Sequence, residues 1–160
     1  MDGRIESTKH GVTLTINKAS TDEDRVRALE ARLGRCLPDD YREFLLRHNG
    51  GRPEPRLFRI PKRGGAYTNS TVDWFLSLHD GQNSNLEKDL HTLRDRIPPD
   101  TLPIADDPFG NVILIGLHDH QRGKIYFWDH EEEPESQPDW SNVVQIADSF
   151  DQFMRELRAT

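Results

Sequence analysis

The stretch LPDDYREFLLRHNGG, residues 37–51, predicts one short helix with both of its ends marked. Pro38 suits a first helical turn, and the two aspartates after it sit where the helix dipole favours negative charge. Asn49-Gly50-Gly51 accepts positive φ and predicts a left-handed stop. One face of this helix carries residues at helical spacing: Leu37, Tyr41, Phe44, Leu45 and His48. We therefore expect the rest of the chain to cover this apolar face.

Length and composition indicate one folded domain. The chain has 160 residues, of which 34% are hydrophobic and 31% are charged, and its apolar residues fall into periodic runs. Cys36 is the single cysteine, which excludes an internal disulfide. No apolar run reaches membrane-spanning length, and the N-terminus lacks the apolar core of a signal peptide. We expect a cytoplasmic protein.

Most of the excess negative charge lies in one stretch. The net charge is −7, and the stretch 129–139 holds six of the 28 acidic residues and no lysine or arginine, which leaves 22 acidic against 21 basic residues elsewhere. A nucleic-acid-binding surface would be basic, so direct binding of nucleic acid is not expected. The stretch is either a solvated loop or a surface for a basic partner. Its acidic residues are Asp129, Glu131, Glu132, Glu133, Glu135 and Asp139.

Hydrophobic periodicity places the remaining elements. Helices are predicted over 22–33, with Ser20 or Thr21 as the cap, over 86–97, with Ser84 or Asn85 as the cap, and after Ser149, which with Gln152 makes a capping-box pattern. Strands are predicted over 12–16, 57–60, 72–78, 102–105, 112–117, 124–130 and 143–146.

Three of these predictions concern position as well as type. Residues 112–117 are apolar on both faces, which indicates a central strand. Pro103 places the strand 102–105 at a sheet edge or at a strand start. Residues 62–70 are expected to form a mobile loop rich in turns.

The order of elements predicts the fold class. Strands in consecutive runs with helices before and after them favour an α+β fold. We expect a single domain with a central, mostly antiparallel sheet of about six strands and about four helices packed around it. Residues 1–19 would form an N-terminal edge strand or extension, and residues 20–160 the domain itself.

Four motifs together resemble a known family. LPDDYREFLLRHNGG is followed by LPIADDPFGNVILIGL, GKIYFWDHEEE and IADSFDQFMREL. In this order and spacing they resemble the SUKH superfamily, and more narrowly its first group, which contains fungal cell-wall-assembly regulators and bacterial immunity proteins. The resemblance covers roughly residues 22–158. It implies an α+β fold and a role without catalysis.

The resemblance also implies a function. Bacterial members typically neutralise polymorphic or contact-dependent toxins, often nucleases, by direct binding. The expected partner is therefore the C-terminal domain of a cognate toxin, basic in charge, and the expected state is a monomer or weak dimer without membrane contact. The alternative is a regulatory or scaffold protein that binds peptide segments of larger partners. The candidate partner-binding residues are Asp129, Glu131, Glu132, Glu133, Glu135 and Trp140.

Two other chemistries have weaker sequence support. His118 and His120, with Asp106 or Asp129, would make a metal site of two histidines and one carboxylate, but the two histidines lie in a predicted turn after a strand. Cys36 would need His48 as its base, although a small, partly buried thiol is the simpler reading.

Adjacent carboxylates are a further catalytic alternative. Asp106 with Asp107, or the run Glu131 to Glu133, could do acid–base work, but loop carboxylates more often stay solvated. We predict no catalytic residue, no cofactor and no metal site.

Overall fold

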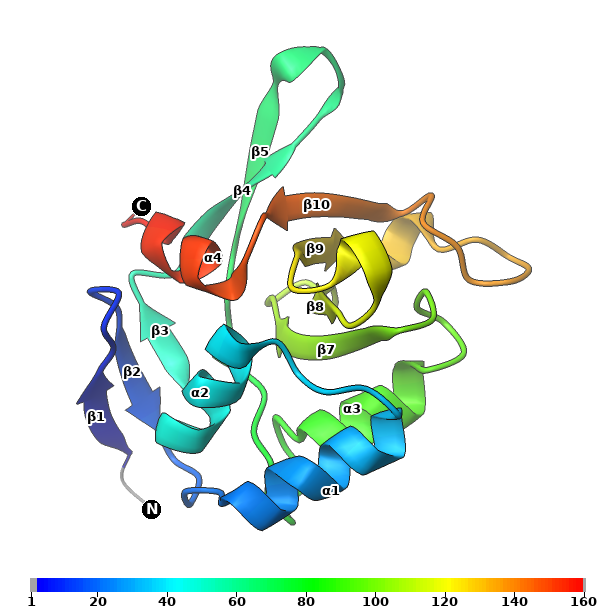
Figure 1. Cartoon of the computed structure of the whole chain (residues 1–160). Helices are drawn as coiled ribbons and strands as arrows, with labels where there is room; N and C mark the ends of the chain where they lie inside the picture. Colours follow the sequence, from blue (N-terminus) through cyan, green and yellow to red (C-terminus); the bar gives the residue numbers. More distant parts are fainter. Residues whose placement is uncertain (1–2, 160) are drawn as a thin grey trace.

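Figure 1 shows the chain as a computed structural model, which describes residues 3–159. Within these residues, four α-helices and ten strands in antiparallel sheets confirm the predicted α+β class. The helices are α1 (Glu23–Leu33), α2 (Asp39–Arg47), α3 (Leu86–Leu93) and α4 (Phe150–Glu156). The strands are β1 (Arg4–Ser7), β2 (Thr13–Ile16), β3 (Arg52–Glu54), β4 (Leu57–Pro61), β5 (Tyr67–Thr71), β6 (Trp74–Phe75), β7 (Thr101–Asp106), β8 (Val112–Gly116), β9 (Ile125–Trp128) and β10 (Val143–Ala147).

The helix within the deciding stretch is α2. Pro38 is its N-cap and His48 its C-cap, so Leu37, Pro38 and His48, which the sequence placed on the helix, lie just outside its regular part. The backbone then turns left-handed at Asn49, Gly50 and Gly51, whose φ angles are 53°, 92° and 121°. This confirms the predicted left-handed stop.

The turn after α2 is fastened to distant parts of the chain. The buried Asn49 amide donates to the carbonyl oxygens of Ala19 and Leu78 at 3.0 and 2.9 Å, and its oxygen accepts from Leu78 N at 2.9 Å. A Cβ atom on Gly50 would lie 2.7 Å from the carbonyl oxygen of Phe75. Only glycine therefore allows this close approach of two backbones.

The apolar face of α2 packs on aromatic rings from the sheet and from α4. The ring centroid of Phe44 lies 5.2 Å from that of Phe75 in β6 and 4.9 Å from that of Phe150. Tyr41 meets Phe150 edge to face at 5.3 Å. All four rings are buried, so α2 occupies the centre of the core.

The main sheet has five strands in the order β10-β9-β8-β7-β6, all antiparallel, rather than about six. β8 lies in the middle and is buried along its whole length, which confirms the predicted central strand. β7 is an inner strand and Pro103 is its third residue, so the prediction that Pro103 marks a sheet edge or a strand start is wrong. The register shifts between Pro103 and Ala105, and this bulge accommodates a residue without an N–H.

A separate three-stranded sheet forms at the N-terminal side, with the order β1-β2-β3. The predicted strand 12–16 is therefore a middle strand and not an edge. The sequence did not reveal β1, because its RIES segment contains one apolar residue, Ile5, whose side chain is exposed.

The predicted mobile loop 62–70 is instead part of a hairpin. β4 and β5 pair from Leu57↔Thr71 to Pro61↔Tyr67, and a short 3₁₀ turn, η1 (Arg63–Gly65), joins them. Most side chains of β5 are polar and exposed, so hydrophobic alternation does not mark it. In Figure 1 this hairpin projects from the body of the molecule. Of the predicted strand 72–78, only Trp74 and Phe75 are in a strand, namely β6.

The helix caps follow the sequence with one exception. Asp22, and not Ser20 or Thr21, caps α1 by accepting from the backbone N–H of the third residue after it. Asn85 caps α3 and Ser149 caps α4 in the same way, as predicted.

Helices α1 and α3 lie side by side below the main sheet (Figure 1). Arg25 and Arg32 of α1 both pair with Glu87 of α3, and the Arg25–Glu87 distance is 3.0 Å. The regular helix α3 ends at Leu93, four residues earlier than predicted, and a turn carries the chain to Ile97.

Candidate functional site

The acidic segment, residues 129–139, leaves the main sheet after β9 and leads back to the edge strand β10. Its first turn is the 3₁₀ helix η3 (His130–Glu132). Two hydrogen bonds close its base: Asp129 N donates to Asn142 O at 3.0 Å, and Asn142 Nδ2 donates to Asp129 O at 2.9 Å. The segment is thus a closed loop with a fixed base.

Two of the six acidic side chains shape this loop. Asp129 accepts from the backbone N–H of Glu131 at 3.0 Å and so caps η3. Asp139 accepts from the backbone N–H of Ser141 at 2.8 Å and from its hydroxyl, and these bonds lower the pKa of Asp139. Both carboxylates are therefore committed to local turns.

Glu133 is also engaged. Arg96, just after α3, donates two hydrogen bonds to it at 3.0 and 2.9 Å, and the Arg96 guanidinium lies 5.4 Å from the ring centroid of buried Trp128. The Arg96 guanidinium lowers the pKa of Glu133 below its ordinary value. This bidentate pair fastens the middle of the acidic segment to the body.

The other three carboxylates have a different environment. Glu131, Glu132 and Glu135 are exposed, and within residues 3–159 none of their side chains makes a hydrogen bond or an ion pair. Three negative charges therefore face solvent on a loop whose base and middle are held. They are free to bind a basic partner without losing an intramolecular bond.

Trp140 has a mainly structural position. Its ring meets Tyr126 of β9 edge to face, with 4.9 Å between centroids, and it packs partly buried against the small apolar cluster that includes Trp128. It supports the end of the acidic segment, and only its uncovered part is available to a partner.

A neighbouring turn adds an apolar side chain to this surface. Asp107 holds the turn between β7 and β8 by accepting from the backbone N–H groups of Phe109 and Asn111, both at 2.9 Å. Phe109 at its tip is 70% exposed. His130 N donates to Asn111 Oδ1 at 3.1 Å, and His130 Nε2 lies 2.9 Å from Phe109 O. The turn and the acidic segment therefore form one unit.

A groove of about 310 Å³ lies between this unit and the β4–β5 hairpin. Hairpin residues form one wall, and Phe109 and the start of the acidic segment form the other. This groove was not predictable from hydrophobic alternation, because β5 carries none, although the Pro-Phe-Gly string at a turn tip was a usable sign of an exposed ring. The principal lining residues are Lys62, Thr68, Asn69, Ser70, Phe109, Asp129, His130 and Glu131.

The structure separates the residues considered for nucleophilic chemistry. Cys36 is exposed, and not partly buried as expected, and it precedes the start of α2. His48 lies after the end of α2, so the length of the helix, about 14 Å at 1.5 Å per residue, separates the two residues. His48 Nδ1 is 2.8 Å from Glu6 Oε1. Cys36 and His48 therefore do not form a nucleophile–base pair.

The residues considered for a metal site are not assembled either. His118 is the N-cap residue of the exposed 3₁₀ turn η2 (Asp119–Gln121), which contains His120. Asp106 accepts from Trp74 N at 3.1 Å, at the β6 side of the sheet. Among the described residues, 3–159, no group of three or more His, Cys, Asp or Glu side chains is arranged to hold a metal ion.

The aspartate pair after β7 has two unlike environments. Asp107 accepts from the turn and from the hydroxyl of Ser70 at 2.9 Å. Burial raises the pKa of Asp106 to about 7, and the carboxylates of Asp73, Asp89 and Asp107 add to the rise. Asp106 is therefore bonded within the sheet and Asp107 within the turn, so each carboxylate has a structural role.

Comparison with known proteins now gives the class and then the family. The α+β body that the four motifs build is a member of the SUKH superfamily, as the sequence predicted. Residues 20–156 match the model of the SMI1/KNR4 family (SUKH-1), and the chain belongs to this family. It is 32% identical over 148 residues to the SPbeta prophage-derived uncharacterized protein YokK of Bacillus subtilis strain 168, a match that covers 84% of this chain and 73% of YokK. Among residues 3–159, no helix has the length and apolar character needed to cross a membrane.

Proposed function

We propose that this protein is an immunity protein that neutralises a cognate toxin domain by binding it through the acidic segment and the adjoining Phe109 turn. Family membership supports the class of protein, and similarity to a prophage-derived protein is consistent with it. The observation that carries the proposal is the set of three exposed carboxylates, Glu131, Glu132 and Glu135, which have no partner within residues 3–159.

The partner's chemistry follows from the surface. Three carboxylates on a held loop favour a basic face on the toxin, as found where a nuclease holds its substrate. Phe109 beside them supplies an apolar anchor, and aromatic residues are common among the dominant contacts of interfaces. The toxin would lose access to nucleic acid because the immunity protein occupies the same basic face.

We also propose that binding alone produces the effect, without turnover of a substrate. Supporting this, two of the residues considered for catalysis serve as structural partners: His48 with Glu6, and Asp107 with its turn. The three exposed carboxylates belong to a loop held by Arg96 and Asn142.

Growth rescue tests the proposal in cells. The toxin domain encoded beside this gene is expressed with the wild-type chain or with Glu131→Lys/Glu132→Lys/Glu135→Lys. The wild type should restore growth, and the triple variant should fail to do so because three attractive contacts become repulsive. The matched control is Asp24→Lys/Glu54→Lys/Glu156→Lys, which changes the net charge equally at exposed positions elsewhere. If the acidic-segment variant still restores growth at equal expression level, this surface is not the contact.

A further inference from the structure

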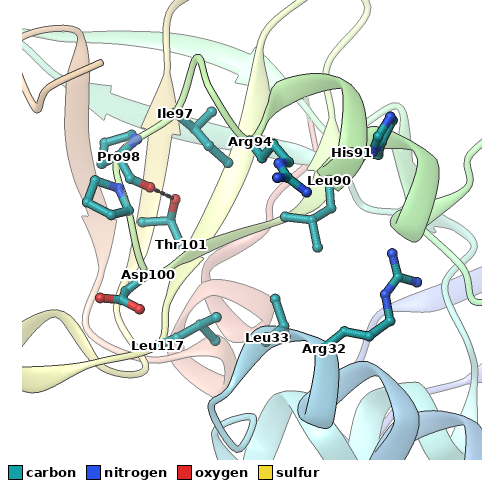
Figure 2. Close-up of a pocket in the computed structure, with 11 residues that line it drawn as sticks. Arg32, Leu33, Leu90, His91, Arg94, Ile97, Pro98, Asp100, Thr101 and Leu117 are labelled. Carbon is teal, nitrogen blue, oxygen red and sulfur yellow. Dashed lines mark hydrogen bonds between the residues drawn. The ribbon is translucent and has the colours of Figure 1, made fainter. Parts of the chain in front are cut away.

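A second concavity lies between α1 and α3 and combines basic with apolar side chains (Figure 2). Its volume is about 250 Å³. Three basic side chains, Arg32, His91 and Arg94, stand at its mouth. The apolar part of its wall is formed by Leu33, Leu90, Ile97 and Leu117.

The charges of this cavity do not cancel. Arg32 is paired with Glu87 across the α1–α3 contact, and Asp100 is paired with Arg35 at 3.2 Å. Arg94 makes no hydrogen bond or ion pair within residues 3–159. One uncompensated positive charge therefore remains in the cavity, although the chain as a whole carries a charge of −7.

The interior of the cavity suits hydrocarbon. Figure 2 shows Leu33 of α1 and Leu90 of α3 facing each other across the opening, with Ile97 and Leu117 further along the wall. The one hydroxyl on this wall, that of Thr101, donates to the carbonyl oxygen of Pro98 at 2.6 Å. Apolar contact therefore comes mainly from Leu33 and Leu90, because Ile97 and Leu117 are each only 2% exposed. The available donors are the side chains of Arg32, His91 and Arg94.

We propose that this cavity binds a small organic monoanion, namely a carboxylate joined to an aliphatic or aromatic body. The carboxylate would pair with Arg94, with His91 beside it, and the hydrocarbon would lie against Leu33 and Leu90. A single charge matches the single uncompensated arginine, since a guanidinium presents paired donors to one carboxylate. The volume lies just below the range of drug-sized ligands, which limits the ligand to a small molecule. This proposal does not depend on the acidic segment.

Titration with octanoate tests the proposal, and the neutral octanamide of the same length serves as the matched ligand. In ¹H–¹⁵N NMR spectra of the full chain, octanoate should cause saturable shifts confined to residues 32–33, 90–101 and 117. Octanamide should bind about tenfold more weakly, because it lacks the charge that Arg94 recognises.

Two variants complete the test. Arg94→Gln should weaken octanoate binding about tenfold. Arg27→Gln, at an exposed position of α1 outside the cavity, should leave it unchanged. Equal affinity for octanoate and octanamide would overturn the proposal. So would an Arg94→Gln variant that binds octanoate as the wild type does, or spectra that stay unchanged at millimolar octanoate.

Discussion

Single residues decide how α2 meets the sheet. Asn49, Gly50 and Gly51 all have positive φ, but they have different surroundings. Asn49 satisfies three backbone hydrogen-bonding groups with one side chain, whereas Gly50 leaves room for the backbone of Phe75. A sequence motif that ends a helix is thus also the point where α2 is fixed to the core.

Alanine substitutions separate the two reasons for glycine at position 50, which are its positive φ and its close approach to the backbone of Phe75. Gly50→Ala introduces both positive-φ strain and a clash with Phe75 O, so it should lower the free energy of unfolding by about 3–5 kcal/mol. Gly34→Ala, at the end of α1, has φ of 69° but open space around its Cβ, and should cost about 1–2 kcal/mol. Urea denaturation of both variants measures the difference. Equal losses would show that the close approach at Gly50 contributes nothing.

Asp106 should make stability depend on pH. Because burial raises its pKa to about 7 from an ordinary 3.8, the folded chain holds this proton more tightly than the unfolded chain does. Its contribution to stability is fully present below about pH 4 and is lost as pH rises through 7, with a slope of up to about 1.4 kcal/mol per pH unit.

Asp106→Asn isolates that contribution, since asparagine keeps an oxygen to accept from Trp74 N. At pH 8 the free energy of unfolding of the variant should exceed that of the wild type by about 1–3 kcal/mol. This difference in stability should become smaller towards pH 4. Urea denaturation at both pH values measures it. A constant gap across this range would mean that Asp106 titrates at its ordinary pKa.

At the scale of elements, the acidic segment is a loop with fixed points and free charges. Asn142 holds its base, Arg96 holds Glu133 in its middle, and His130 joins it to the Phe109 turn. These fixed points restrict the motion of the loop that carries Glu131, Glu132 and Glu135. Because the loop is already ordered, binding a partner costs less conformational entropy.

Removing the Glu133 charge should loosen this loop with little effect on the fold. Glu133→Gln should speed amide hydrogen exchange across residues 131–141, and it should lower global stability by about 1 kcal/mol or less, as expected for a solvent-exposed pair. The control is Glu135→Gln, whose side chain has no partner within residues 3–159. Exchange that stays as slow as in the wild type would mean that the Arg96 pair does not hold the segment.

The elements that sequence reasoning predicted are those with a hydrophobic period or a cap. α2, β8 and the Ser149 cap of α4 are such cases. β1 and β5 were missed because their side chains are mostly polar or exposed and their pairing depends on distant strands. The edge position of the 102–105 strand was wrong because a bulge beside Pro103 is a second way to accommodate proline.

The candidate surface was predictable only as a charge pattern. The run of acidic residues was plain in the sequence, but the pairing of Glu133 depends on Arg96, which folding brings close. Asp129 and Asp139 instead accept from backbone N–H groups two residues further along the chain. The groove beside Phe109 depends on a hairpin that the sequence did not reveal.

At the scale of the whole molecule, two surfaces of opposite charge lie on one α+β body. The acidic segment follows β9, Phe109 lies in the turn between β7 and β8, and the basic cavity lies between α1 and α3. Each surface can be altered at exposed side chains without changing the buried aromatic core around α2. The two proposals are therefore testable separately on the same protein.

The affinity of the purified protein for the toxin domain encoded beside its gene is the most direct test of the proposed function. Calorimetric titration should give a dissociation constant that rises about a hundredfold or more for Glu131→Lys/Glu132→Lys/Glu135→Lys, because each reversal replaces attraction by repulsion. The Asp24→Lys/Glu54→Lys/Glu156→Lys control should bind like the wild type. An unchanged dissociation constant for the acidic-segment variant, or an equal loss in both variants, would contradict binding through this surface.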